Sequence, residues 1–223
     1  MKNKAVKPQI TPNLDHPDLN HNETAQILPP DWFARPTCVV ASDLIGKIIY
    51  RKVIDEGGVE QILRMRISET EAYIGEGDRA CHAHAGTRTA RTEIMYHEGG
   101  VIYVYLTYGI HFMLNLVSGA AESPEAVLIR AGFFVDEAGD LDNDNPEFDI
   151  KKLSGPGKLT KQLAIDKSLY GKVIAPDSML WVEDDGARPP VSLRPRIGID
   201  YAGEAKDWLL RYIWTSHPSL SKK

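Results

Sequence analysis

Residues 59–74 read VEQILRMRISETEAYI, and apolar and polar side chains alternate along this stretch in the manner of a β-strand. A period of two places every second residue on the same face of a sheet. A preceding strand is predicted over 47–54, because the Gly57-Gly58 pair supplies the positive φ values that a tight hairpin requires. One face of the second strand then carries Leu63, Met65, Ile67, Glu69, Glu71 and Tyr73. Two carboxylates are therefore expected to continue an apolar face.

A second hairpin is predicted further along the chain. Residues 101–107 and 110–117 are rich in β-branched and aromatic side chains, and Tyr108-Gly109 lies between them. A tyrosine is therefore expected at the exposed tip of this hairpin. The other elements that the pattern indicates are strands over 126–135, 179–182, 196–199 and 211–214, and helices over 37–46, with Thr37 as N-cap, and 157–165.

The composition indicates one folded domain behind a polar segment. The chain has 223 residues, 43% of them apolar, which is enough to bury one substantial core. Residues 1–28 contain few large apolar groups, so we predict a mobile tail there and a folded domain over 29–223. Two cysteines make no disulfide framework, and no apolar run is long enough for a signal-peptide core or a membrane span. A cytoplasmic protein is expected.

The overall charge argues against a nucleic-acid partner. The formal net charge is -5, whereas proteins that bind phosphate backbones normally carry a basic footprint. Binding depends on the field over one face, however, so a local basic patch can coexist with an acidic remainder. Scattered, solvated cations are the alternative. The residues that could form such a patch are Arg88, Arg91, Lys151, Lys152, Lys158, Lys161 and Lys167.

Two segments imitate metal sites without completing one. Cys81, His82 and His84 have no second ligand pair at the spacing that zinc sites use. The acidic loop over 136–149 begins like a calcium loop, but Asn145 stands where that loop requires glycine. No metal and no cofactor is therefore predicted. His82 stays a candidate for stacking or hydrogen bonding, with an ordinary loop histidine as the alternative.

The carboxylate of Glu71 is the strongest candidate for chemistry. Hydrolysis of a nucleoside needs a base near the anomeric carbon and negative charge to stabilise an oxocarbenium-like transition state. A carboxylate on an apolar face meets both needs, because desolvation raises its pKa. A structural ion pair with an arginine is the alternative reading. Glu69 lies two residues away, roughly 6.5 Å along the strand, which also suits a sugar hydrolase with paired carboxylates.

Other polar and aromatic motifs admit two interpretations each. Tyr103 and Tyr105 alternate onto one strand face, where they either stack on a base or pack in the core. The run Ser154-Gly155-Pro156-Gly157-Lys158 precedes a predicted helix, so its amides and lysine either hold a phosphate or form a simple turn and cap.

Several of these motifs together resemble the alkyladenine (3-methyladenine) DNA glycosylase family. They are Ser68-Glu69-Thr70-Glu71-Ala72-Tyr73, His82, Tyr103-Val104-Tyr105-Leu106-Thr107-Tyr108-Gly109, Asn115, Arg130 and the 154–158 run. The resemblance covers about residues 30–218. It implies a single α+β domain with a curved, mainly antiparallel sheet, flanking helices and a protruding β-hairpin. It also implies a monofunctional enzyme of base excision repair that flips a damaged purine out of DNA, hydrolyses its N-glycosidic bond and leaves an abasic site.

The resemblance assigns roles at the reacting centre. Glu71 matches the general base that activates water, and Arg130 matches a residue beside that water. Tyr73 on one side, and His82 with Tyr105 on the other, match the walls that sandwich the flipped base. No lysine is placed by a recognised motif for lyase chemistry, so strand cleavage is not expected.

The resemblance also assigns contacts that select the base and hold the duplex. Asn115 matches the residue that disfavours the guanine amino group, and Tyr108 matches the wedge that fills the gap in the duplex. The implied partner is double-stranded DNA with damaged purines, bound by a monomer. The matching DNA-side contacts are Tyr103, Arg91, Ser154 and Lys158.

Two other functions fit part of the sequence. A nucleoside or glycoside hydrolase would use Glu69 and Glu71 as its carboxylate pair. A non-catalytic nucleic-acid binding module would use Tyr103, Tyr105 and Tyr108 as a stacking platform and would keep Glu71 as a structural residue.

Overall fold

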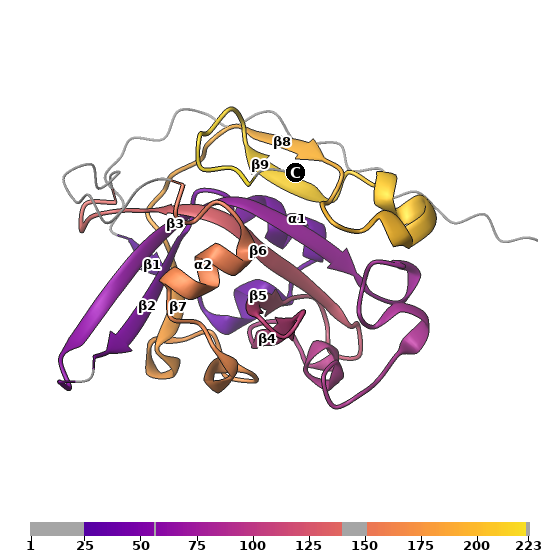
Figure 1. Cartoon of the computed structure of the whole chain (residues 1–223), viewed down its shortest axis with the longest axis horizontal. Helices are drawn as coiled ribbons and strands as arrows, with labels where there is room; N and C mark the ends of the chain where they lie inside the picture. Colours follow the sequence, from indigo (N-terminus) through magenta and orange to yellow (C-terminus); the bar gives the residue numbers. More distant parts are fainter. Residues whose placement is uncertain (1–24, 56, 140–150, 222–223) are drawn as a thin grey trace, which may run out of the picture.

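The computed structural model describes residues 25–55, 57–139 and 151–221 as one antiparallel sheet with helices against it (Figure 1). The strands are β1 (Gln26–Ile27), β2 (Ile48–Ile54), β3 (Glu60–Ile74), β4 (Ile102–Thr107), β5 (His111–Val117), β6 (Glu125–Phe134), β7 (Leu180–Asp184), β8 (Val191–Arg194) and β9 (Arg211–Trp214). The α-helices are α1 (Thr37–Asp43) and α2 (Pro156–Gln162). Short 3₁₀ turns, numbered η1 to η7, connect them. The predicted α+β class is confirmed.

The long strand β3 organises the sheet. The spatial order is β1-β7-β2-β3-β6-β5-β4, so β6 lies along one edge of β3. The other edge is shared, since β2 pairs with residues 60–66 and β9 pairs with residues 69–71. The antiparallel pair β8–β9, yellow in Figure 1, therefore lies along β3 beyond the point where its pairing with β2 ends. The sheet forks near the middle of β3, and this fork is where the two glutamates lie.

The pairing of β3 with β6 is irregular at the same place, and the irregularity reverses the faces of the strand. The register shifts between Ile67 and Glu69 and again between Glu69 and Thr70. Ile67 and Ala72 both lie in the main core, although residues five apart on a regular strand point to opposite faces. Glu71, next to Ala72, therefore points away from the core that holds Ile67. The prediction that Glu71 continues the face of Met65 and Ile67 is wrong.

The main core lies between the sheet and α1. Val40, Ala41 and Leu44 of this segment are buried against the sheet, and α1 packs on β3 and β6. The predicted cap at Thr37 is wrong, because Pro36 is the N-cap and the Thr37 hydroxyl instead donates to Glu125 and bonds to Ser118. Helix α2 packs against β5 and β6.

The ends of the predicted elements differ modestly from the observed ones, with one exception. Both predicted hairpins form, and β9 has the predicted bounds of 211–214. The strand predicted over 196–199 is wrong, because β8 covers 191–194 and residues 195–199 lead into η7 (Asp200–Asp207). The predicted tail over 1–28 includes β1, which pairs with β7, and its residues 1–24 lie outside the described residues. Most of the acidic loop, 140–149, also lies outside them.

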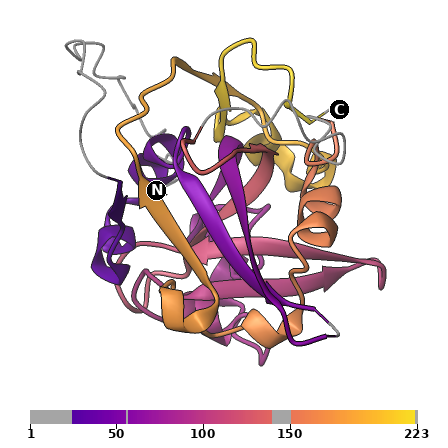
Figure 2. The same cartoon turned by 90° about the vertical axis from the view of Figure 1, so that its left-hand side faces the viewer.

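The β4–β5 hairpin ends in a tight turn that exposes a tyrosine. Tyr108 and Gly109 have φ values of 49° and 69°, and the amide of Ile110 donates to the carbonyl of Thr107 at 3.1 Å, which closes a β-turn. Thr107 pairs with His111, so the loop has three residues. A positive φ costs a tyrosine about 1–2 kcal/mol relative to glycine. Tyr108 is 94% exposed, as predicted. Figure 2 shows the magenta hairpin extending sideways below α2, so its tip projects from the body of the protein.

Candidate active site

The register of the sheet brings three predicted site residues, Glu71, Asn115 and Tyr103, onto one face. Glu71 pairs with Leu128, Leu128 pairs with Asn115, and Asn115 pairs with Tyr103. Directly opposed residues of antiparallel strands point to the same face. The row from Glu71 to Tyr103 therefore crosses β3, β6, β5 and β4 on the face opposite the main core. Neighbouring strands lie about 4.8 Å apart, so Asn115 stands roughly 10 Å from Glu71.

The carboxylate of Glu71 is fully buried and is held mainly by neutral donors. Its Oε1 accepts the backbone N–H of Ile197 at 2.8 Å, and its Oε2 accepts the Tyr73 hydroxyl at 2.9 Å. The nearest cation is Arg130, whose Nη1 lies 3.6 Å from Oε2. Desolvation raises the pKa of Glu71, although Arg130 and the two hydrogen bonds oppose it. Burial therefore disfavours the charged form of this carboxylate, which makes it a stronger base when it is ionised.

Glu69 is equally buried but has a denser set of partners. Its Oε1 accepts Arg211 Nη1 at 3.0 Å and the Ser221 hydroxyl at 2.8 Å, and it lies 3.2 Å from Arg130 Nε. Its Oε2 accepts the backbone N–H of Ser221 at 2.7 Å. Both oxygens are thus committed to fixed donors. An acid or a nucleophile in a paired-carboxylate hydrolase needs a freer carboxyl, so this geometry disfavours that alternative.

A buried ion pair supports Tyr73 and the segment that reaches Glu71. Arg196 donates to Asp78 at 2.5 and 2.7 Å and to the Ala72 carbonyl at 2.9 Å. Its guanidinium lies 4.7 Å from the centre of the Tyr73 ring. Because Arg196 precedes Ile197 directly, the pair also fixes the N–H that bonds Glu71. The pKa of the Tyr73 hydroxyl is raised by desolvation and by Glu71, so it stays protonated and donates.

Three aromatic side chains gather beside the carboxylate. The rings of His82 and Tyr105 meet edge to face at 4.6 Å, and Tyr103 lies 5.3 Å from Tyr105. The Tyr103 hydroxyl bonds to Nδ1 of His82 at 2.8 Å. Burial lowers the pKa of His82 to about 4, so the ring is neutral at physiological pH. Tyr73 and Tyr105 both pack against the cluster that includes Cys81 and Tyr103. An aromatic region therefore adjoins Glu71.

The side chain of Asn115 is buried and oriented by the backbone. Its amide nitrogen donates to the carbonyls of Tyr103 at 3.2 Å and Met113 at 3.4 Å. These bonds fix which way the amide faces. Tyr103 itself is only 1% exposed, so its side chain lies beneath the surface and supports His82 rather than touching a ligand outside.

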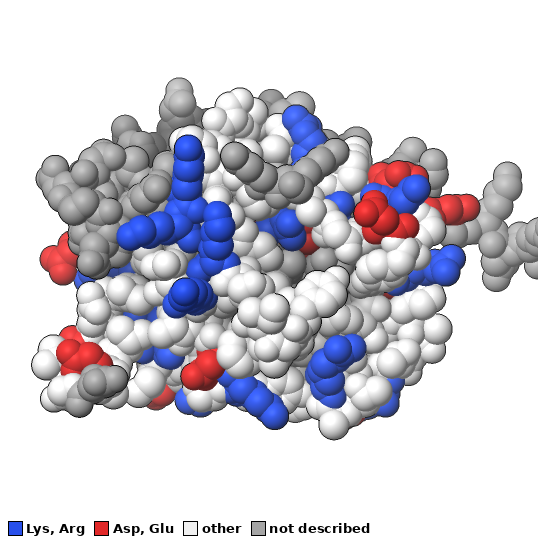
Figure 3. All heavy atoms as spheres, in the orientation of Figure 1, with Lys and Arg blue, Asp and Glu red and all other residues white. Residues whose placement is uncertain are grey.

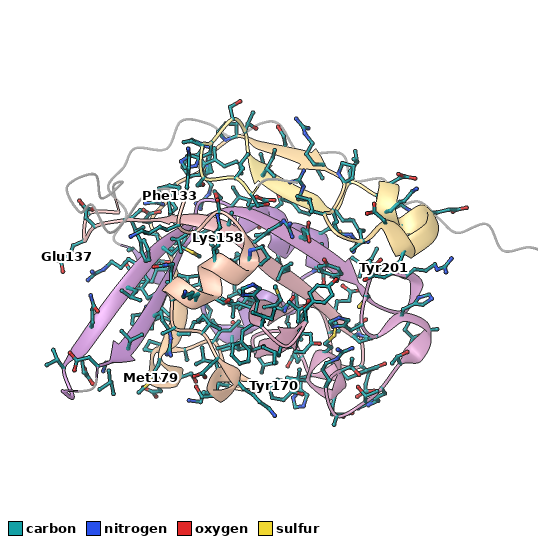
Figure 4. All side chains as sticks on the ribbon, in the orientation of Figure 1. Phe133, Glu137, Lys158, Tyr170, Met179 and Tyr201 are labelled. Carbon is teal, nitrogen blue, oxygen red and sulfur yellow. The ribbon has the colours of Figure 1, made fainter. Side chains whose placement is uncertain are left out.

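Three of the predicted DNA-side residues, Arg91, Ser154 and Lys158, lie at or near the surface. Lys158 on α2 and Arg91 are exposed, and Ser154, before α2, is half-buried with its hydroxyl donated to the Lys151 carbonyl. Figure 3 shows Lys and Arg side chains gathered over α2 on the face from which the hairpin projects. In Figure 4, Lys158 and Tyr201 of η7 appear on opposite sides of that hairpin. The local basic patch expected for a nucleic-acid partner is present on this face.

One cation from the predicted basic patch is already neutralised. Arg88 binds Glu93 and Glu122 at 2.7–2.9 Å and lies over the ring of Tyr96. Its charge is therefore balanced within the loop. Ala90, two residues after Arg88, is held by another contact, because the Tyr170 hydroxyl donates to its carbonyl at 3.0 Å. The loop is thereby fixed while the neighbouring Arg91 stays exposed.

The described ranges contain no metal site and no membrane-spanning helix. No group of three or more His, Cys, Asp or Glu side chains could hold a metal ion. The His84 ring bonds to the Glu76 carbonyl at 2.8 Å, away from Cys81 and His82. No helix is long and apolar enough to cross a membrane.

Sequence reasoning missed the residues that support the two glutamates. Asp78, Arg196 and Arg211 come from different parts of the chain, and their contacts depend on tertiary structure. Arg196 and Arg211 lie within residues 30–218, over which the sequence resembles the glycosylase family, so that likeness gave a weak signal. Nothing in the sequence pointed to Ser221 or to the backbone N–H of Ile197.

Comparison with known proteins identifies the family of this chain. Residues 31–218 match the model of the family described as "Methylpurine-DNA glycosylase (MPG)". The chain belongs to this family. A protein of Psychrobacter cryohalolentis named "Putative 3-methyladenine DNA glycosylase" is 70% identical over 89% of this chain and 97% of its own length. Proteins of the same name from Methanocella arvoryzae and Natranaerobius thermophilus are 41% and 40% identical over 88% and 86% of this chain, and over 96% of their own lengths.

Family membership confirms the function predicted from the sequence. The methylpurine-DNA glycosylase is a hydrolase of N-glycosyl bonds that removes alkylated purines from DNA in base excision repair. Its substrate is damaged DNA. The acidic net charge therefore did not exclude a nucleic-acid partner, because Lys and Arg side chains gather over α2 on the face that Figure 3 shows.

Proposed function

We propose that this glycosylase uses Glu71 to activate the water that attacks C1′ of a flipped, alkylated purine nucleotide such as 3-methyladenine. The observation that carries the proposal is the surroundings of Glu71. Its carboxylate is fully buried, held by neutral donors at 2.8 and 2.9 Å, and 3.6 Å from Arg130. A general base needs a raised pKa, and burial raises the pKa of Glu71. It must also present negative charge to the transition state, and neutral donors do not cancel that charge. Arg130 is proposed to help hold the water.

We further propose that the aromatic region beside Glu71 receives the base. Tyr73 forms one wall, and His82 with Tyr105 forms the other. An alkylated purine carries positive charge, which aromatic faces attract. The low pKa of His82, about 4, favours this role, because a neutral imidazole does not repel a cationic base. Asn115, with its amide fixed by two carbonyls, is proposed to reject the guanine amino group.

The proposed entry of the base depends on Tyr108. Its side chain is 94% exposed, and its backbone adopts a φ of 49°, which glycine would adopt at lower cost. A strained, solvated tyrosine at a hairpin tip is explained if it inserts into the duplex as the nucleotide leaves. Flipping costs a few kcal/mol, and less for lesions that already weaken pairing. Arg91, Ser154 and Lys158 are proposed to hold the backbone beside it.

The remaining parts of the proposal concern products and assembly. The enzyme is monofunctional and leaves an abasic site without cutting the strand. It is proposed to work as a monomer, because every proposed contact comes from one chain. It is also proposed to act in the cytoplasm. Hypoxanthine, 7-methylguanine and ethenoadenine compete with 3-methyladenine as substrates, and a difference of about 1.4 kcal/mol in binding sets a tenfold preference among them.

The test is single-turnover excision from duplexes that carry each lesion. Glu71→Gln is expected to bind lesion DNA as the wild type does and to release no base. Tyr108→Ser is expected to release base slowly from duplexes but to act normally once the lesion sits in a single strand. Excision by Glu71→Gln at the wild-type rate would reject the proposal. Activity on free nucleosides with Tyr108→Ser neutral would instead favour the hydrolase alternative.

A further inference from the structure

The last described residues of the chain fold back onto the two glutamates. Ser219 is fully buried and donates its hydroxyl to that of Ser68 at 2.6 Å. His217 stacks on Phe133 of β6 with ring centres 4.4 Å apart. These contacts bring Ser221 to the fork in the sheet. The family match ends at residue 218, so family membership assigns nothing to Ser219 or Ser221.

Ser221 joins Glu69 to Arg130. Its N–H donates to Glu69 Oε2 at 2.7 Å, and its hydroxyl donates to Glu69 Oε1 at 2.8 Å. The same hydroxyl oxygen accepts Arg130 Nε at 3.0 Å. Arg130 is therefore fixed at its Nε by Ser221 and Glu69, while its Nη1 extends toward Glu71 at 3.6 Å. A residue at the end of the chain thus fixes the guanidinium that faces the proposed base.

We propose that Ser221 is a positioning residue for base excision, which satisfies Glu69 so that Arg130 stays within reach of Glu71. The inference rests on the proposed function. Glu69 and Glu71 share Arg130, and Glu69 has three further donors, of which Ser221 supplies two. When these donors are removed, Glu69 draws Arg130 toward itself. Glu71 then loses its nearest cation and gains a stronger negative neighbour.

This change has a direction that can be measured. The groups that face Glu71 are Glu69 and Tyr73 on β3, Arg130 on β6, Tyr105 on β4 and Arg196 after β8. Among them Arg130 lowers the pKa of Glu71 and Glu69 raises it. Weaker contact with Arg130 and a less neutralised Glu69 both raise it further. The acidic limb of the excision rate must therefore move to higher pH, which a purely structural role of Ser221 would not produce.

The experiment measures single-turnover excision against pH for three variants at Ser221. Ser221→Ala removes the hydroxyl and keeps the N–H, Ser221→Thr keeps both, and a chain ending at Leu220 removes both. Thr215→Ala is the matched control, because it removes an exposed hydroxyl bonded to Ser192 on the same segment. Lesion-DNA affinity and thermal unfolding are measured alongside, and all rates are taken below the melting transition.

Ser221→Ala is expected to excise several-fold more slowly, with its acidic midpoint about half a pH unit higher and lesion affinity unchanged. The shortened chain is expected to show a larger shift in the same direction, whereas Ser221→Thr and Thr215→Ala match the wild type. A wild-type profile for Ser221→Ala would overturn the inference, as would equal losses for Ser221→Ala and Ser221→Thr. Glu71→Gln is run in parallel, because wild-type excision by that variant would reject the proposed function itself.

Discussion

The surroundings of Glu69 and Glu71 differ more than their positions do. The two glutamates are two residues apart on β3, and both are fully buried. Glu69 accepts from Arg211 and from two groups of Ser221, with Arg130 at 3.2 Å. Glu71 accepts from one amide and one hydroxyl, with its nearest cation at 3.6 Å. The charge of Glu69 is balanced by close cationic and neutral donors. The charge of Glu71 is less fully compensated by its neighbours.

If Glu71 is the base, as proposed, the difference means that burial alone does not make a catalytic carboxylate. Desolvation raises the pKa of any buried acid, and full ion pairing offsets it. Glu69 is paired closely enough to act as a structural anchor of the fork between β2 and β9. Glu71 is paired only loosely, so its basicity remains available for chemistry. Under the proposed function, the same residue type therefore serves two purposes on one strand, and the same substitution at each position can separate them.

The largest effect is expected at Glu71. Glu71→Gln keeps the shape and the acceptor for the Ile197 N–H but removes the base, so single-turnover excision should fall by at least about 10³-fold. Binding to lesion DNA, measured by fluorescence anisotropy, should change little. A fall of only two- or threefold would show that the base lies elsewhere and would end the contrast between the two glutamates.

A different kind of loss is expected from the same substitution at Glu69. Glu69→Gln leaves Arg211 and Arg130 without a full counter-charge, and breaking a buried pair costs about 3–5 kcal/mol. Denaturant unfolding should report that loss, while excision below the melting transition stays within about tenfold of the wild type. Unchanged stability together with abolished excision would reverse the roles assigned to Glu69 and Glu71.

The smallest effect is expected where one neutral donor is removed. Tyr73→Phe keeps the ring but deletes the hydroxyl that donates to Glu71 at 2.9 Å. A hydrogen bond to a charged group contributes about 1.5–3 kcal/mol, so excision should slow by about 10- to 10²-fold. Because this bond lowers the pKa of Glu71, the acidic midpoint should also rise. A midpoint that falls would contradict the proposed direction of the hydrogen bond.

Much of the fold could be predicted from local pattern. The two hairpins and the exposed Tyr108 followed from strand periodicity and from glycine placement, which act over a few residues. The face of Glu71 could not be predicted in this way. Its orientation depends on a register shift between β3 and β6, and alternation along one strand does not reveal an irregularity in its pairing. The cap at Thr37 failed for a related reason, because a distant acid, Glu125, competes for that hydroxyl.

For the candidate site, the residues in recognisable motifs could be predicted from the sequence, whereas the residues that support them could not. Glu71, Tyr73, His82 and Tyr105 were found through motifs, and the fold brings them together on one face. Tyr103 was expected at the DNA side but is buried and instead bonds to His82. The supporting residues escaped prediction because each is distant in sequence from the group it holds, as with Ser221 and Glu69, 152 positions apart.

The pH dependence of single-turnover excision by the wild type tests the central claim most directly. Desolvation raises the folded-state pKa of Glu71, so the active, ionised form should be lost as pH falls through a value above the ordinary 4.5. The account predicts a rate that declines with a midpoint above that value and a decline that Glu71→Gln abolishes. A rate that stays flat down to pH 4 in protein that remains folded would contradict it.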